Sequence, residues 1–344
     1  MQNQIYNRIL IILSLSFVIR QVKTMMKVKS IKMSKKTHPT GDPKFAVMQA
    51  FPAGISAEEA DPFLMCDHFG PTLSTGRETD PDKFPVGWHP HRGMDILTYM
   101  VEGGGRHADS LGNRGEFPSP GMQWISVGSG IEHAEGGGSP KGTTYLGFQI
   151  WVNVPSKRKM DDPKYGTEPP ENIPFLSNLP SYPGVSARVL AGTVVFPVAD
   201  SKPITAVGPF KTVQEVQIVD LMLESNATFV HTLQESLNNC IVYLYKGSAT
   251  ICGGKVPTLH VIHLDASDPT TRSITFTAGA DGMAAMIFAG KKLNQPIAWH
   301  GPFVMTTDEE IRKTIEEYQS GRFLKKRAPF DYKRIDAFPK KEEL

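Results

Sequence analysis

The sequence predicts an all-β protein made of two antiparallel β domains and closed by one C-terminal helix. Short apolar runs separated by turns recur through most of its 344 residues, which include 31 glycines and 27 prolines. Runs of this kind at regular spacing are typical of an antiparallel sandwich or barrel. A Pro-rich stretch over residues 155–184 divides them into two groups. We therefore expect a first domain over residues 44–154, a linker over 155–184, a second domain over 185–330 and a tail over 331–344.

The expected strands are rich in β-branched and aromatic residues and end at Gly, Pro or Asp. In the first domain they cover residues 45–51, 62–67, 95–101, 122–127 and 145–152. In the second domain they cover residues 186–195, 213–223, 227–233, 240–245, 249–252, 259–264, 273–277 and 283–289.

The expected helix covers residues 308–320. Thr307 with Glu310 three positions later forms a capping box, in which each side chain binds a free backbone N–H at the helix start. Ile311 and Ile315 begin an apolar stripe, and Gly321 provides a C-terminal stop.

The first 40 residues differ from the rest of the chain. They carry eight Lys or Arg residues and no acid, and residues 9–19 are mostly apolar. That run is too short to span a bilayer, but it fits the core of a secretory signal or part of a mitochondrial presequence. A later start of translation would remove it. We expect residues 1–40 to be a basic extension, either a targeting segment or disordered, that the fold does not need.

Charge and cysteine content restrict the partners and the compartment. Beyond residue 41 the chain has 29 basic and 35 acidic side chains, a net charge of −6, which argues against direct binding of nucleic acid. Cys66, Cys240 and Cys252 are too few for a disulfide framework and indicate a reducing compartment. We expect a monomer of the cytoplasm or nucleus without a stable membrane span, or a mitochondrial or secreted protein if residues 1–40 direct it there.

Two pairs of polar residues stand out in the first domain, each in a further short segment that reads as a strand. His89 and His91 flank Pro90, and His133 and Glu135 have the same one-residue spacing. Alternate side chains of an extended strand share a face, so each pair can point at one ion. Imidazole and carboxylate ligands without thiolate favour iron, manganese, nickel or copper at an open site over structural zinc. The alternative is two solvated pairs in unrelated loops.

Longer stretches around these pairs resemble the pirin family. The similarity is carried by residues 89–99 (HPHRGMDILTY), 120–135 (PGMQWISVGSGIEHAE) and 293–307 (LNQPIAWHGPFVMTT). The resemblance implies a bicupin, with two antiparallel β-barrels face to face. It also implies one Fe(II) held by His89, His91, His133 and Glu135, a site that tolerates copper, nickel or manganese. No H-x-H or H-x-E pair occurs in the second half, so we expect that barrel to be metal-free.

Several neighbouring residues are candidates for supporting roles. Asp95 is the rival oxygen ligand, because cupins outside this family often take a carboxylate about four residues after the second histidine. His107 could orient a metal ligand or lie on the surface. Arg92 could line the pocket or pair with a nearby acid. Trp124, with Trp88 and Met94, could wall an apolar pocket or pack in the core.

The resemblance suggests a function of the quercetin 2,3-dioxygenase type. The substrate would then be a small flavonol-like aromatic, opened with O₂, and Glu135 would serve both as a metal ligand and as the general base for the substrate hydroxyl. The alternative is an iron-dependent nuclear coregulator that binds a transcription factor without turnover. A third possibility is a stress-related metal-binding protein.

Overall fold

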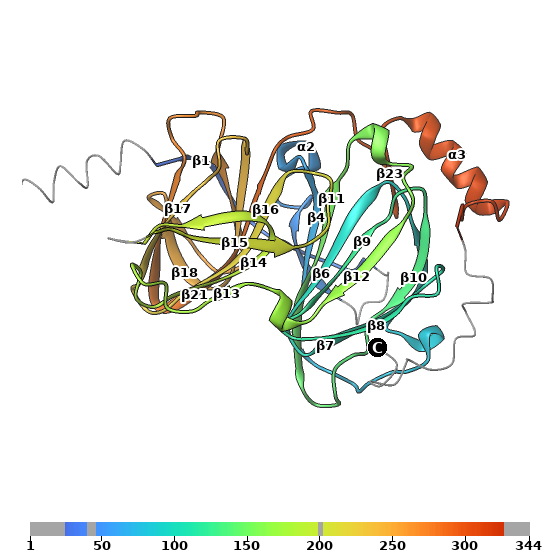
Figure 1. Ribbon diagram of the computed structural model, residues 1–344, viewed down its shortest axis with the longest axis horizontal. Helices are drawn as coiled ribbons and strands as arrows, with labels where there is room; N and C mark the ends of the chain where they lie inside the picture. Colours follow the sequence, from blue (N-terminus) through green and yellow to red (C-terminus); the bar gives the residue numbers. More distant parts are fainter. Residues whose placement is uncertain (1–24, 40–45, 199–201, 327–344) are drawn as a thin grey trace, which may run out of the picture.

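The computed structural model describes residues 25–39, 46–198 and 202–326. Within these ranges the chain forms two antiparallel β bodies side by side, with helix α3 (Asp308–Gln319) on the outer side of the first body (Figure 1). This confirms the predicted all-β class with one C-terminal helix. Of the helices in the described ranges, none is long and apolar enough to cross a membrane.

The first body, the N-terminal barrel, consists of two sheets. In spatial order the larger sheet contains β12 (Lys164–Glu168), β9 (Met122–Ser126), β6 (Met94–Glu102), β11 (Thr144–Asn153), β4 (Phe63–Leu73), β3 (Val47–Phe51) and β2 (Lys35–Thr37). The smaller sheet contains β5 (Val86–His91), β10 (Ile131–Glu135), β7 (Gly104–Asp109) and β8 (Arg114–Pro118). Strand β5 is at an edge of its sheet, where Pro90 costs no ladder hydrogen bond.

The second body, the C-terminal barrel, contains most of the remaining strands. Its main path runs β1 (Lys27–Met33), β20 (His260–Asp265), β18 (Asn239–Ile251), β21 (Ser273–Gly290), β16 (Val216–Leu223), β14 (Val185–Phe196) and β13 (Phe175–Leu176). Three further strands pair at its sides, β15 (Ile204–Pro209), β17 (Thr228–Thr232) and β19 (Gly254–Val256). The Pro-rich segment predicted as a linker therefore supplies an edge strand to each barrel, β12 and β13.

Short helices mark the connections between strands. They are α2 (Ala57–Ala60) and the 3₁₀ turns η1 (Pro81–Lys83), η2 (Ser156–Arg158) and η3 (Pro170–Asn172). The long helix α3 has the predicted capping box, in which the Thr307 hydroxyl accepts from the Glu310 backbone N–H. Gly321 follows it with φ +71°. This φ favours glycine and agrees with the predicted stop.

The C-terminal segment returns to the N-terminal barrel. After the last strand of its own barrel the chain forms a hairpin of β22 (Ala298–His300) and β23 (Phe303–Met305) and then α3. We call residues 298–324 the C-terminal strap. The Arg92 carbonyl oxygen accepts a hydrogen bond of 3.0 Å from the Val304 N–H. The strap thus joins the strand end that carries the first histidine pair.

Strand β6 shows how the barrels divide the polar and apolar side chains. Met94 and Ile96 pack inside the N-terminal barrel, and the Thr98 hydroxyl lies 3.4 Å from Glu135 in the same interior. Leu97 and Tyr99 alternate with them and pack in an apolar cluster shared with the C-terminal barrel. Even-numbered residues of β6 therefore face the barrel interior, and odd-numbered ones face the interface.

Ordered structure begins earlier than predicted. The expectation that residues 1–40 lie outside the fold is wrong for residues 25–37, because β1 pairs with β20 and β2 pairs with β3. Met26 is 1 % exposed in the core of the C-terminal barrel. The lysines of β1 suited a targeting sequence, but lysines are also common on exposed edge strands. The predicted targeting run at residues 9–19 lies outside the described residues.

Removal of β1 should destabilise the protein. A chain beginning at Ser34 lacks Met26 and the β1 ladder, whereas one beginning at Met25 keeps both. We expect the shorter chain to lose about 3 kcal/mol in free energy of unfolding, from one buried side chain and the hydrogen bonds of one edge. Urea titrations of the two chains measure this difference. Equal midpoints would show that β1 contributes nothing.

Candidate metal centre

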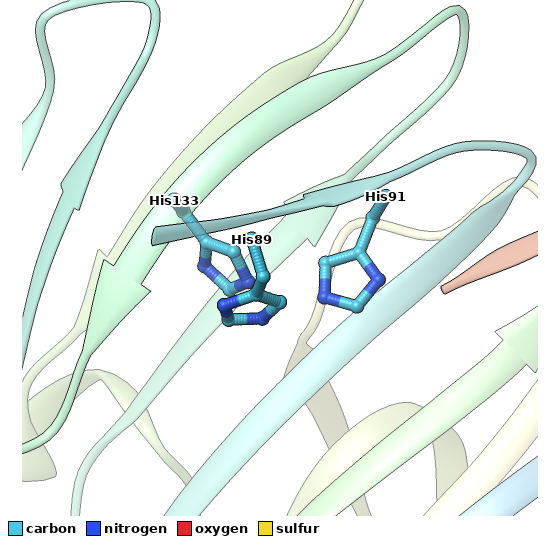
Figure 2. A group of neighbouring side chains, drawn as sticks. All are labelled: His89, His91 and His133. Carbon is cyan, nitrogen blue, oxygen red and sulfur yellow. The ribbon is translucent and has the colours of Figure 1, made fainter. Parts of the chain in front are cut away.

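Three histidine side chains converge between β5 and β10. His133 lies opposite His89 in the register of these strands, and His91 follows two residues after His89. Their ring centroids lie 4.3 to 5.0 Å apart, and their ligand nitrogens all lie within 4.8 Å of one another (Figure 2). The structure thus brings together the histidines of both sequence pairs.

The hydrogen bonds of the rings leave nitrogens free for an ion. Nδ1 of His89 lies 2.7 Å from the Gly87 carbonyl oxygen, and Nδ1 of His91 lies 3.3 Å from that of Pro302. When Nδ1–H donates to a carbonyl, Nε2 keeps its lone pair. Nε2 of His91 and both ring nitrogens of His133 are buried without a hydrogen-bond partner among the described residues. Buried polar atoms are normally paired, so these nitrogens fit a metal ion.

Burial also favours the neutral, ligating form of two of these rings. It lowers the pKa of His91 and of His133 well below the usual value, and the nearby imidazoles lower it further. Neutral imidazole is the form that binds metals. The chemistry of the three donors therefore suits a divalent transition metal.

Glu135 is held beside the histidines by donors from the opposite sheet. Its Oε2 accepts from Gln123 Nε2 at 2.6 Å, and its Oε1 accepts from Gln149 Nε2 at 3.1 Å. The Thr98 hydroxyl accepts from Gln123 and donates to Gln149, which fixes both amides. We call Thr98, Gln123 and Gln149 the amide cradle. Among the described residues, the group with all ligand atoms within 4.8 Å contains the three histidines and not Glu135.

The structure places Asp95 away from this site. Asp95 is an odd-numbered residue of β6 and lies opposite Ser126 in the register. Burial raises its pKa to about 7, and hydrogen bonds from Thr212 and Ser126 offset this only in part. Thr212 belongs to the other barrel, so the carboxyl points toward the interface. The predicted alternatives of a rival ligand or a pocket residue are therefore wrong for Asp95.

The raised pKa of Asp95 predicts a pH dependence of stability. An unfolded aspartate has a pKa of about 3.9, so the contribution of Asp95 is fully present below about pH 4 and is lost as the pH rises through about 7. Between pH 5 and pH 8 the parent should lose about 2–3 kcal/mol more than Asp95→Asn. Urea unfolding at both pH values tests this. A parallel decline in the two proteins would contradict it.

Trp124 also faces away from the metal centre. It neighbours Gln123 on β9, so its ring points to the opposite side, where it packs against the cluster between the barrels. Its Nε1 donates to Glu168 at 3.2 Å. Of the two alternatives for Trp124, core packing agrees with the structure, and a place in the pocket wall does not.

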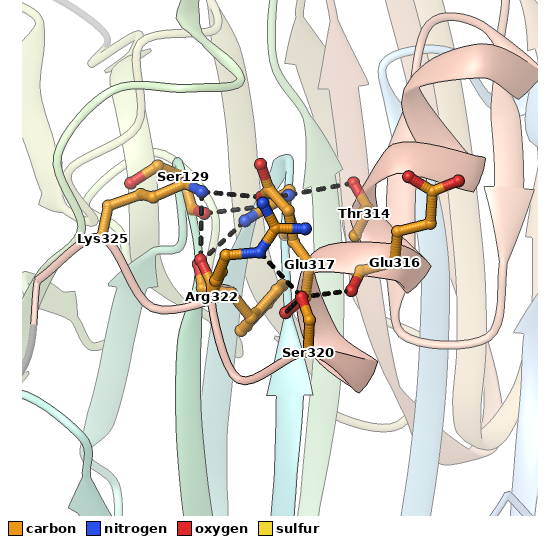
Figure 3. Close-up of polar contacts among 9 residues, drawn as sticks. Ser129, Thr314, Glu316, Glu317, Ser320, Arg322 and Lys325 are labelled. Atoms are coloured by element: carbon orange, nitrogen blue, oxygen red, sulfur yellow. Dashed lines mark hydrogen bonds and ion pairs between the residues drawn. The ribbon is translucent and has the colours of Figure 1, made fainter.

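Arg92 links the first histidine pair to the C-terminal strap. Its side chain is 2 % exposed, and its guanidinium lies 4.5 Å above the centre of the Phe323 ring. It donates to the Ser129 carbonyl oxygen at 2.8 Å and to the Thr314 hydroxyl at 3.1 Å. It also donates to Glu317 at 2.8 Å, and Figure 3 shows Glu317 and Thr314 projecting from α3. Arg92 therefore pairs with an acid, as one alternative predicted, and fixes the strap.

His107 lies next to the metal centre and is fully buried. Its Nε2 lies 2.9 Å from Asp109 Oδ2, and its ring stacks on Tyr165 with centroids 4.1 Å apart. The ring centroid is 5.4 Å from that of His133. His107 is thus not a surface residue. Its ring packs against His133, but among the described residues no hydrogen bond joins the two rings, so a role in orienting a metal ligand stays a prediction.

A cavity of about 930 Å³ opens onto His89, His91 and Glu135. Trp88, Trp151 and Trp299 line it, and the last comes from the C-terminal strap. The centroids of Trp151 and Trp299 lie 5.8 Å apart, and Trp151 also contacts His91 edge-on at 5.1 Å. Sequence reasoning pointed to Trp88 and missed the other two. The volume is typical of a site for a small organic ligand.

Comparisons with known proteins give a consistent match. Residues 44–152 match the family model Pirin, and residues 218–324 match the Pirin C-terminal cupin domain. The chain is 35 % identical over 289 residues to a Pseudomonas aeruginosa protein named "Putative quercetin 2,3-dioxygenase", covering 83 % of this chain and 94 % of that protein. It is 30 % identical to a pirin-like protein of Caulobacter vibrioides, covering 87 % of this chain and all of that protein.

Solved structures show the same architecture. A quercetin 2,3-dioxygenase from Acinetobacter baumannii superposes with a TM-score of 0.71 at 26 % identity, covering 87 % of this chain and 98 % of that one. A bacterial pirin from Escherichia coli in complex with nickel(II) has a TM-score of 0.52 at 18 % identity, covering 77 % of this chain and 99 % of that one. The second likeness concerns the fold alone.

Proposed function

This chain belongs to the pirin family, with the two cupin barrels that its motifs predicted, and we propose that it is a metal-dependent dioxygenase of the quercetin 2,3-dioxygenase type. The observation that carries this proposal is the convergence of three imidazoles beside a cavity of about 930 Å³ that is lined by two of them, His89 and His91, and by the buried carboxylate of Glu135. A small aromatic substrate such as a flavonol fits a cavity of that size and aromatic lining.

We assign the metal to His89, His91 and His133, with Glu135 as the fourth ligand. Glu135 lies two residues after His133 on β10 and lines the same cavity as His89 and His91. Iron(II) is our first choice, and nickel, copper and manganese suit the same donors. When bound, the metal supplies Lewis acidity that favours the deprotonated form of a substrate hydroxyl.

We expect Glu135 to take up the proton of that hydroxyl. Its two oxygens accept hydrogen bonds from Gln123 and Gln149, which hold the carboxylate in one orientation at the cavity wall. A base fixed in this way needs little rearrangement before proton transfer. Trp151 and Trp299 add aromatic surface that can contact a flat ring, because both line the same cavity.

The test is aerobic incubation of the metal-loaded protein with quercetin. The flavonol absorbance should fall, and carbon monoxide should be released in proportion. Protein treated with a chelator and then passed through a desalting column is the control, and it should leave quercetin unchanged. If the metal-loaded protein neither consumes quercetin nor releases carbon monoxide, the proposed reaction is wrong.

A further inference from the structure

A row of polar side chains crosses the inner wall of the N-terminal barrel. Gln123, Thr98, Gln149, Asp67 and Gln49 lie opposite one another on five adjacent strands, β9, β6, β11, β4 and β3. We call these five side chains the polar row. Its first three members form the amide cradle of Glu135, and its last two extend beyond the cradle. The row therefore starts at the metal centre and continues past it.

The wall on either side of this row is mostly apolar. Met65 and Phe69 flank Asp67 on β4, and Met100 and Trp151 occupy the equivalent inward positions on the next two strands. A carboxyl group in such surroundings is costly unless it is well hydrogen-bonded. Their contacts with Glu135 explain why Thr98, Gln123 and Gln149 are polar. Asp67 makes no such contact, so its presence in this wall needs another explanation.

Asp67 is buried, lines the cavity and is only partly satisfied. Asp67 is 4 % exposed, and its Oδ1 accepts a hydrogen bond of 2.8 Å from Gln49 Nε2. Among the described residues no other hydrogen bond reaches this carboxyl. Burial raises the pKa of Asp67 to about 6, with the Gln49 contact offsetting part of the effect. A carboxylate held on one side by a single amide keeps Oδ2 as an acceptor for a ligand.

The spacing between strands sets the length of a ligand that could reach from the metal centre to Asp67. Asp67 lies two strands from Thr98, which is at the middle of the cradle, and adjacent strands are about 4.8 Å apart. Asp67 and the middle of the cradle are thus about 10 Å apart, which is the scale of two or three fused or linked aromatic rings. The indoles of Trp151 and Trp299 line the same cavity and suit a planar molecule of that length.

We propose that Asp67 is a specificity-determining residue, which accepts a hydrogen bond from a hydroxyl on the substrate ring remote from the metal centre. The site would then select planar polyphenols over otherwise similar molecules that carry only the hydroxyl at the metal end. The inference deepens the proposed function, since it takes the other end of the ligand to lie at the histidines. It does not require turnover.

Ligand binding without oxygen tests this inference. The metal-loaded full chain is titrated under nitrogen with quercetin and with 3-hydroxyflavone, which lacks the remote hydroxyls, and quenching of tryptophan fluorescence gives each affinity. The parent should prefer quercetin about tenfold or more, the usual scale for one hydrogen bond to a charged group. Asp67→Asn should reduce the preference to about threefold or less and leave the affinity for 3-hydroxyflavone unchanged.

Asp95→Asn is the matched control, because Asp95 is a buried aspartate of the same sheet that faces the opposite side. It should keep the parental preference. If Asp67→Asn fails to fold, Asp67→Ser serves in its place. Equal affinities in the parent, or an unchanged preference in the folded Asp67 variant, would overturn the proposal. Quercetin consumption in air is scored separately, so lack of turnover with an Asp67-dependent preference would refute the reaction and not this inference.

Discussion

Glu135→Gln should reduce quercetin turnover by a factor on the order of 10² to 10⁴, the usual contribution of a positioned base. The variant removes the negative charge and the proton acceptor at the cavity wall. An amide at position 135 also turns an N–H group toward the donors of Gln123 or Gln149, which disturbs the cradle. We also expect lower metal occupancy, because an amide oxygen is a weaker ligand than a carboxylate. Carbon monoxide release and metal content of the purified variant measure both effects.

Asp95→Asn is again the appropriate comparison, since it makes the same change in charge at a buried site that faces the barrel interface. It should keep both metal and turnover close to the parental values. The opposite pattern, with metal lost from Asp95→Asn and kept by Glu135→Gln, would show that the site is assembled as in other cupins and that Glu135 is misassigned.

Arg92→Met should weaken the attachment of the C-terminal strap and lower the free energy of unfolding by about 3 kcal/mol or more. Arg92 donates to Ser129, to Thr314 and Glu317 of α3, and to the Phe323 carbonyl oxygen. Methionine fills similar space but satisfies none of these groups, and removing one partner of a buried charged network is strongly destabilising. The strap also carries Pro302, whose carbonyl oxygen lies 3.3 Å from Nδ1 of His91 and orients that ring. Metal affinity should therefore fall as well.

Arg312→Met provides the control for this variant. Arg312 is an exposed residue of the same helix, with a side chain that is 68 % exposed, so its loss should change stability by less than about 0.5 kcal/mol. Thermal unfolding and limited proteolysis near α3 compare the two proteins. Equal stabilities, with equal resistance of α3 to protease, would mean that the buried network does not hold the strap.

The fold class and the histidine centre could be predicted because their signals are local. The one-residue spacing of His89 and His91, and of His133 and Glu135, already places each pair on one face of a strand. The helix boundaries followed from Thr307, Glu310 and Gly321 for a similar reason. These features depend on a few consecutive residues and not on which distant segments pack together.

The other features of the site depend on contacts between distant segments, or on which face of a strand a side chain takes. The sequence alone did not determine either. Trp124 was a candidate because it lies near the ligand pairs in the sequence, but it is its neighbour Gln123 that faces the metal centre. Trp299 reaches the cavity only because the strap crosses between barrels. Lys159 lies within the predicted linker, yet it is 2 % exposed and donates to Gly93, Asn153 and Val304. The cradle could have been predicted only from an isolated polar residue within an apolar strand, such as Gln149.

The central claim is that one metal ion binds at the three histidines, and elemental analysis of purified variants tests it most directly. His89→Ala is compared with His260→Ala, because both rings place Nδ1 near the carbonyl oxygen two residues earlier and only His89 belongs to the cluster. We predict about one transition-metal ion per chain in the parent and in His260→Ala, and well below one in His89→Ala. A full complement of metal in His89→Ala, or its loss from His260→Ala alone, would contradict the assignment.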